Sequence, residues 1–117
     1  MAERILVIED NDTLRYALCR EVEAAGYDVK HARDYRDGLD ALEDGKRVSL
    51  LVIDVVLPGV NGFALARMAR MRHHDIKIIY MTGFADIPLH EADGPILHKP
   101  VQPDVLLATI RNTLRAT

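Results

Sequence analysis

Three acidic residues stand where two short apolar runs of the chain end. Glu9 and Asp10 follow the first run, and Asp54 follows the run at 50–53. If these runs are neighbouring parallel strands, the carboxylates meet at one edge of a sheet. At close range two such charges repel each other by about 1 kcal/mol in water and about 4 kcal/mol at an effective dielectric constant of 20. A hard divalent cation relieves the repulsion, so the residues predict a Mg²⁺ site.

Two further polar residues close apolar runs in the same way. Thr82 follows the run at 77–81, and Lys99 follows the run at 96–98. In a parallel sheet these ends lie side by side, so a hydroxyl and an ammonium would join the carboxylates in one cleft. A carboxylate can attack phosphorus when a cation and a lysine neutralise the transferring oxygens. The set is therefore suited to phosphoryl transfer onto a carboxylate.

The elements that must position these residues alternate between apolar runs and segments of helical period. This alternation is typical of βαβ units and a parallel sheet, so we expect an α/β fold in a single domain over residues 1–117. The five expected strands cover 4–8, 28–32, 50–53, 77–81 and 96–98. About five helices are expected: at 13–25, from Tyr35 to a stop at Gly45, at 63–72, a short or irregular piece within 83–95, and one from Pro103 onward.

Local signals refine two of these helices. Asp12 is the expected N-cap of the first helix, because a carboxylate at that position can accept a hydrogen bond from the first turn. In the helix at 63–72 we expect Leu65, Met68 and Ala69 to face inward. The stretch at 57–62 is read as turn chemistry between the third strand and this helix.

Composition limits the possible partners and the compartment. The net charge is −3 and the pI is near 5.9, so we expect no binding to nucleic acid. The single cysteine, Cys19, excludes an internal disulfide and is read as a helix residue without a role. The amino-terminal residues lack the long apolar stretch of a signal peptide or membrane span. We therefore expect a cytoplasmic protein that does not bind membranes.

Taken in order, these residues resemble the receiver domain of two-component response regulators over the whole chain. The resemblance depends on the pair Glu9–Asp10, on Asp54 with the turn at 57–62, on Thr82, and on Lys99 followed by Pro100. It implies a single doubly wound five-stranded parallel sheet of flavodoxin-like order 2-1-3-4-5, with helices on both faces.

The resemblance also implies a role for each residue of the motif. Asp54 would be the phosphoacceptor, Thr82 the switch hydroxyl and Lys99 the cation that binds the phosphate. Glu9, Asp10 and Asp54 would hold Mg²⁺, and the backbone carbonyl of Val56 would complete the metal site. The peptide bond before Pro100 would be cis. The partners would be a histidine kinase or phosphotransfer protein as donor and an output protein as receiver of the signal.

The chain departs from the receiver pattern on the output side. The aromatic residue that receivers commonly carry three positions before the lysine is replaced by Ile96. The interval between Thr82 and Lys99 is short, so we expect a truncated fourth helix and an unusual output surface with Ile87 and Leu89 as exposed contacts.

A second departure concerns hydrolysis of the acyl phosphate. In receiver domains, attack by water is tuned by the residues two positions after the phosphoacceptor and two after the threonine. The resemblance places Val56 and Phe84 at these positions, and neither side chain can orient a water molecule. We therefore expect slow intrinsic dephosphorylation.

Three functions compete at this point. The first is a phosphorylation-dependent switch that is not an enzyme beyond its own phosphorylation and dephosphorylation on Asp54. The second is a pseudo-receiver that binds partners without phosphate. The third is a phosphatase of the haloacid-dehalogenase type with Asp10 as nucleophile, because Asp10 and Asp12 resemble its first motif. We expect the chain to act as a stand-alone receiver, and an adaptor complex of a regulated protease is one candidate for its output.

Overall fold

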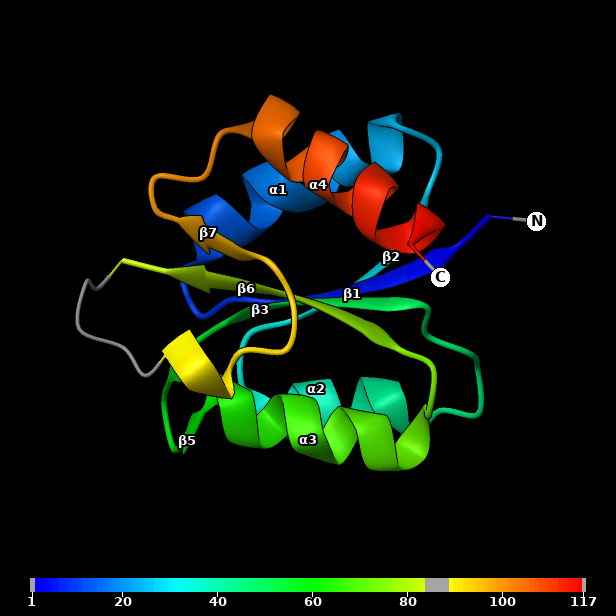
Figure 1. Ribbon diagram of the computed structural model, residues 1–117, viewed down its shortest axis with the longest axis vertical. Coiled ribbons are helices and arrows are strands. Elements are labelled where there is room, and N and C mark those ends of the chain that lie inside the picture. The colour runs from blue at the N-terminus through cyan, green and yellow to red at the C-terminus, as the bar shows by residue number, and fades with distance from the viewer. Residues whose placement is uncertain (1, 84–88, 117) are drawn as a thin grey trace.

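The computed structural model describes residues 2–83 and 89–116, without the side chain of Leu89. A five-stranded parallel sheet lies between two layers of helices, with α1 and α4 on one face and α2 and α3 on the other (Figure 1). The strands of the sheet are β1 (Arg4–Ile8), β2 (Asp28–Ala32), β3 (Leu50–Asp54), β6 (Lys77–Thr82) and β7 (Ile96–His98). The helices are α1 (Asp12–Ala24), α2 (Tyr35–Leu42), α3 (Gly62–Arg72) and α4 (Pro103–Arg115).

The strand order is β2-β1-β3-β6-β7, which confirms the predicted flavodoxin-like order. β1 pairs with β2 on one side and with β3 on the other, so the order reverses beside β1. In such sheets the crevice beyond the strand ends at this reversal is where ligands bind. Glu9 follows β1 and Asp54 ends β3, so the topology brings the predicted carboxylates to that crevice.

Two apolar layers hold the sheet in place. β1 is buried along its whole length, as is β3, which explains why their sequences are apolar runs rather than alternating patterns. α1 packs on one face through a stripe that repeats every three or four residues and includes Leu18, Cys19 and Val22. The Cys19 side chain is buried in this layer. Burial, with a smaller contribution from the charge of Glu23, raises the pKa of the Cys19 thiol to about 11.

Two local predictions are wrong. The N-cap of α1 is Asn11 and not Asp12: the Asn11 side chain accepts a hydrogen bond from the Leu14 N–H at 2.9 Å, and Asp12 is the first helical residue. The helix simply begins one residue earlier, at a residue that caps equally well. Met68 does not face inward but is 36% exposed, because it is turned by about 100° from Ala69, which lies on the buried stripe of α3.

The predicted turn at 57–62 contains a small hairpin. β4 (Val56–Leu57) pairs antiparallel with β5 (Val60–Asn61), and Gly59 turns the chain with a φ of +87°. The positive φ explains the glycine, since other residues rarely adopt it. Asn61 then caps α3 by accepting a hydrogen bond from the Ala64 N–H at 2.8 Å.

The fourth helix of the prediction is reduced, as expected, to a single turn in the described residues. This 3₁₀ turn, η1, covers Leu89–Glu91, and the chain then runs to β7. The predicted contacts Ile87 and the Leu89 side chain lie outside the described part of the structure, and so does Phe84. Across the residues that the structure describes, no helix has the length and apolar character needed to cross a bilayer.

Candidate functional site

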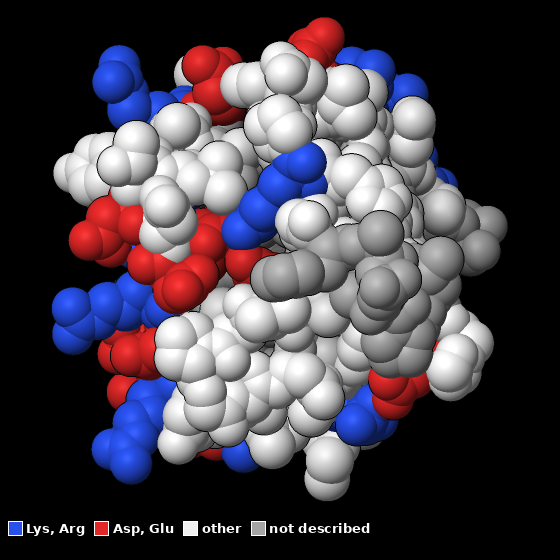
Figure 2. Space-filling model, turned by 90° about the vertical axis from the view of Figure 1, so that its left-hand side faces the viewer, with Lys and Arg blue, Asp and Glu red and all other residues white. Residues whose placement is uncertain are grey.

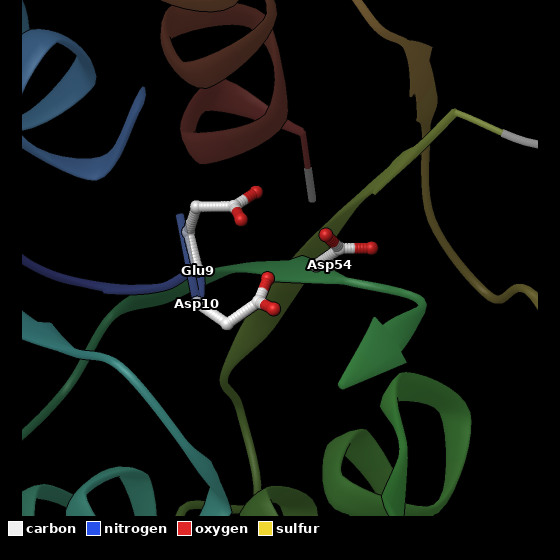
Figure 3. A group of neighbouring side chains, drawn as sticks. All are labelled: Glu9, Asp10 and Asp54. Atoms are coloured by element: carbon white, nitrogen blue, oxygen red, sulfur yellow. The ribbon is translucent and has the colours of Figure 1, made fainter. Parts of the chain in front are cut away.

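The three predicted carboxylates meet at the ends of β1 and β3. Their nearest ligand atoms all lie within 4.8 Å of one another. Glu9 and Asp54 are buried, whereas Asp10 is exposed to solvent. Figure 3 shows the carboxylates gathered on one side of the strand ends, and Figure 2 shows that acidic side chains gather beside a basic one on this face of the molecule. A set of hard oxygen donors at this spacing fits Mg²⁺.

Lys99 joins two of the carboxylates from the end of β7. Its Nζ lies 2.6 Å from Glu9 Oε1 and 2.6 Å from Asp54 Oδ2. Burial alone would lower the pKa of Lys99, but its hydrogen bonds with Asp54 and Glu9 and their charges raise it above its usual value. Burial raises the pKa of the Glu9 carboxyl, and the Lys99 ammonium opposes that shift only in part. The lysine therefore stays charged in a pocket that holds more acid than base.

Backbone groups fix the direction of the two buried carboxylates. The Asn11 N–H donates to Glu9 Oε2 at 2.9 Å, and the Val56 N–H donates to Asp54 Oδ1 at 2.9 Å. The Gly62 N–H donates to the Val55 carbonyl at 2.6 Å. A Cβ at Gly62 would overlap the carbonyl oxygen of Asp54, so the start of α3 packs directly on the chain beside Asp54. The hairpin and α3 thus hold Asp54 from one side.

Thr82 and Lys99 are connected through the sheet. Thr82 is fully buried at the end of β6, and its carbonyl accepts a hydrogen bond from the Lys99 N–H at 2.8 Å. The peptide bond between Lys99 and Pro100 is cis, as expected. The structure therefore brings Glu9, Asp10, Asp54 and Lys99 together as one set, which we call the pocket cluster, and places Thr82 on the strand next to β3. The proposed ligand role of the Val56 carbonyl stays a prediction.

One buried charge beside this site is absent from the sequence prediction. Arg15 lies on the inner face of α1, and its Nη1 donates to the Glu9 carbonyl at 2.9 Å. Its signal was present in the sequence, since Arg15 stands three residues before Leu18 on the buried stripe of the helix.

A second polar set lies on β6, away from the pocket cluster. The Tyr80 hydroxyl donates to Asp93 Oδ1 at 2.6 Å, and Asp93 forms an ion pair with Arg70 of α3. The Tyr80 side chain is buried, with its ring centroid 5.0 Å from that of Phe63. Burial, reinforced by the hydrogen bond and charge of Asp93, raises the pKa of Tyr80 to about 12. We call Arg70, Tyr80 and Asp93 the edge cluster. Its three members come from separate elements, and no sequence pattern connects them.

Known proteins resemble the chain in both sequence and fold. Residues 5–111 match the family model of the response regulator receiver domain. The response regulator receiver protein CpdR of Brucella abortus is 35% identical, over 97% of this chain and 98% of that protein. The sensor kinase CckA of Brucella abortus is 32% identical over 94% of this chain, but the match spans only 12% of the kinase.

A solved structure extends the likeness to three dimensions. The CheY-like receiver domain protein of Methanospirillum hungatei superposes with a TM-score of 0.89 at 28% identity, covering 97% of this chain and 94% of that one. The family model covers most of the chain, and CpdR matches along nearly its whole length. The chain therefore belongs to the response regulator receiver domain family, the phosphorylation-dependent signalling switches of two-component systems.

Proposed function

We propose that Asp54 is the residue that accepts the phosphoryl group, and that Glu9, Asp10, Asp54 and the Val56 carbonyl hold Mg²⁺. One observation carries the proposal: the Asp54 carboxylate contacts a lysine ammonium at 2.6 Å and lies within 4.8 Å of two further carboxylates at the reversal point of the sheet. The acids alone would attract a cation, and the lysine alone would attract an anion. Together they suit a phosphoryl group that arrives with a divalent cation.

The transfer follows from the chemistry of the two partners. One carboxylate oxygen of Asp54 attacks the phosphorus of a phosphohistidine, a phosphorus–oxygen bond forms, and the phosphorus–nitrogen bond breaks with its electron pair going to the imidazole. Lys99 neutralises charge on the transferring oxygens, and Thr82 donates a hydrogen bond to one of them. Mg²⁺ held by Glu9, Asp10, Asp54 and the Val56 carbonyl would supply further neutralisation of negative charge in the pocket. The chain thereby catalyses its own phosphorylation, and Asp54 becomes an acyl phosphate.

In this proposal β7 transmits the change in the pocket cluster to the output surface. The Lys99 N–H donates to the Thr82 carbonyl, so a displacement of either residue is passed directly between β6 and β7. Ile96 cannot act as the usual aromatic reporter, because it has neither a ring nor a polar group. We propose that the output surface is formed by β7, the segment 89–95 and α4.

The partners follow from this role. A histidine kinase or phosphotransfer protein donates the phosphoryl group, and the output is a contact with another protein, with a protease adaptor complex as one candidate. Phosphohistidine donors that depend on ATP work in the cytoplasm, so we place the chain there. The net charge of −3 gives no support to a nucleic-acid or membrane partner.

Covalent labelling tests the proposal. The full chain is treated with acetyl phosphate and Mg²⁺, and intact mass spectrometry measures the gain of one phosphoryl group. Asp54→Asn should abolish the gain, whereas Asp93→Asn, which removes an acid of the edge cluster, should leave it unchanged within about twofold.

Two other results would replace the proposal. If the label persists in Asp54→Asn and is lost in Asp10→Asn, the chain uses Asp10 as a phosphatase would. If wild type and both variants stay unlabelled by acetyl phosphate and by a phosphorylated histidine donor, the chain is a pseudo-receiver.

A further inference from the structure

Arg15 is a buried arginine directly behind the acidic end of β1. Its side chain is only 10% exposed. Nη1 donates to the Glu9 carbonyl at 2.9 Å and Nη2 to Asp12 Oδ1 at 2.7 Å, while Nε has no hydrogen-bond partner among the described residues. A guanidinium in an apolar helix face costs free energy that incomplete hydrogen bonding does not offset. Its position therefore calls for a reason other than stability.

The hydrogen bond from Arg15 acts on the peptide unit between two predicted cation ligands. The Glu9 N–H is fixed by the Ala32 carbonyl at 3.1 Å, and its carboxylate by the Asn11 N–H at 2.9 Å. Arg15 holds the remaining backbone group of Glu9, its carbonyl. That carbonyl lies in the same plane as the Asp10 N–H. This plane also fixes the positions of the Asp10 nitrogen and Cα, from which the exposed Asp10 side chain extends.

We propose that Arg15 is a positioning residue for the cation site, which aligns the Glu9 and Asp10 carboxylates through the peptide that joins them. The inference rests on the proposed function, because it presupposes that these residues bind a divalent cation. The charge of Arg15 and its hydrogen bond act in opposite directions. A positive charge behind the site repels a cation, whereas an aligned peptide improves the ligand geometry. The sign of the change in affinity when Arg15 is removed therefore separates the two effects.

Direct binding of Mn²⁺ provides the measurement. The ion is titrated into the full chain, and electron paramagnetic resonance reports the free Mn²⁺. Loss of an outer-shell partner commonly weakens metal binding by about 10- to 100-fold, so Arg15→Met should raise the dissociation constant about tenfold. Arg15→Lys should restore part of the loss, because its ammonium can still donate a hydrogen bond to the Glu9 carbonyl.

Two variants control for charge and for the second partner of Arg15. Arg20→Met removes the same charge from an exposed position on the same helix, and should leave Mn²⁺ binding unchanged or slightly tighter. Asp12→Asn removes the negative charge of the exposed partner of the guanidinium but keeps the hydrogen bond of Arg15 to Glu9, and should change the dissociation constant by less than about twofold.

The possible results separate this inference from the proposed function. Failure of the wild type to bind Mn²⁺ overturns both. Wild-type binding with equal or tighter binding by Arg15→Met overturns the inference alone, and so does equal weakening by Arg20→Met. Thermal unfolding in EDTA shows whether Arg15→Met is folded. If it is not, Arg15→Ala, which also lacks the donor to the Glu9 carbonyl, decides, and a dissociation constant equal to that of the wild type would contradict the inference.

Discussion

The pocket cluster and the edge cluster are built from similar parts with different charge balance. Each joins distant elements through one cation and its oxygen partners: Lys99 between Glu9 and Asp54 in the pocket, and Arg70 with Asp93 and Tyr80 at the edge. The pocket holds three acids against one lysine, whereas the edge cluster pairs one acid with one arginine. The pocket therefore has an excess of negative charge that a cationic ligand would balance, whereas the charges of the edge cluster already balance each other.

This difference assigns different mechanical roles to two positions of β6. Thr82 lies at the end that faces the pocket, and Tyr80, two residues earlier, is tied to α3 through Asp93 and Arg70. The contacts of Tyr80 resist displacement of β6 at that residue. A structural change in the pocket cluster is therefore expected to displace the neighbouring strand β7 rather than to shift β6 along its length.

The largest expected effect comes from two glycines that touch strand carbonyls, one in each region. A Cβ at Gly62 would overlap the Asp54 carbonyl, and a Cβ at Gly94 would overlap the Ile78 carbonyl. Each change to alanine should lower the free energy of unfolding by about 1–3 kcal/mol, as overpacking does. Only Gly62→Ala should also slow phosphoryl labelling, because it displaces the backbone of Asp54. Urea unfolding and mass spectrometry measure the two effects.

Gly83→Ala is the matched control, since among the described residues a Cβ there would meet only Lys99 Cδ at 3.9 Å. It should change the free energy of unfolding by less than about 0.5 kcal/mol. Slowed labelling in Gly94→Ala would show that the two regions are not separate.

The next effect is loss of the buried hydroxyl of the edge cluster. Tyr80→Phe removes the hydrogen bond to Asp93 and should cost about 1–2 kcal/mol of unfolding free energy at neutral pH. Phosphoryl labelling should be unaffected. An unchanged stability would mean that the edge cluster does not anchor β6.

The stability difference between wild type and Tyr80→Phe is also expected to depend on pH. The pKa of Tyr80 is raised from 10.0 to about 12 in the folded chain, so the unfolded chain loses this proton first. The contribution of the protonated Tyr80 hydroxyl to the free energy of unfolding is complete below pH 10 and disappears as the pH rises to about 12. The stability difference between wild type and Tyr80→Phe should therefore shrink over that interval. Taking the difference cancels the contribution of Cys19, whose pKa is raised to about 11 in both proteins.

A smaller effect tests the apolar rim of the pocket. Val56 is 49% exposed beside Asp54, and its side chain cannot hold water for attack on the acyl phosphate. Val56→Asn should accelerate loss of the phosphoryl group severalfold, which corresponds to about 1 kcal/mol or less on the barrier. Val56→Leu is the control and should leave the decay slow. Wild-type decay within seconds would contradict the assumption of slow hydrolysis.

The smallest expected effect comes from the excess negative charge of the pocket cluster. Without divalent cations, Asp10→Asn should raise the free energy of unfolding by a few tenths of a kcal/mol, because it relieves repulsion with Glu9 and Asp54. With added Mg²⁺ the wild type should become more stable than Asp10→Asn. A ligand present at 100 times its dissociation constant stabilises the protein that binds it by about 2.7 kcal/mol. Thermal unfolding with EDTA and with Mg²⁺ measures both. If Mg²⁺ stabilises both proteins equally, Asp10 is not a ligand.

The pocket was predictable from the sequence because each of its side chains stands at the end of an apolar run. The strand order was implied by the resemblance to receiver domains, and Glu9, Asp54 and Lys99 lie together at the strand ends as predicted. The edge cluster was not predictable, because Tyr80 stands inside a buried strand and its partners Asp93 and Arg70 resemble ordinary surface charges.

Errors of the prediction are local and have local causes. Asn11 and Asp12 cap helices about equally well, so sequence alone does not choose between them. The hairpin of β4 and β5 has only two residues in each strand, too short for an alternating pattern. Met68 was assigned to the wrong face because an apolar residue beside a buried stripe looks like part of it.

The buried thiol of Cys19 has a practical consequence for studying this switch. With a pKa of about 11, roughly one thiol in ten thousand is ionised at pH 7, and the side chain is only 6% exposed. Maleimide reagents should therefore leave the native chain almost unlabelled. A cysteine introduced at exposed His98 or Val105 would then be the single site for a fluorophore, so movement of β7 and α4 could be followed without first removing Cys19.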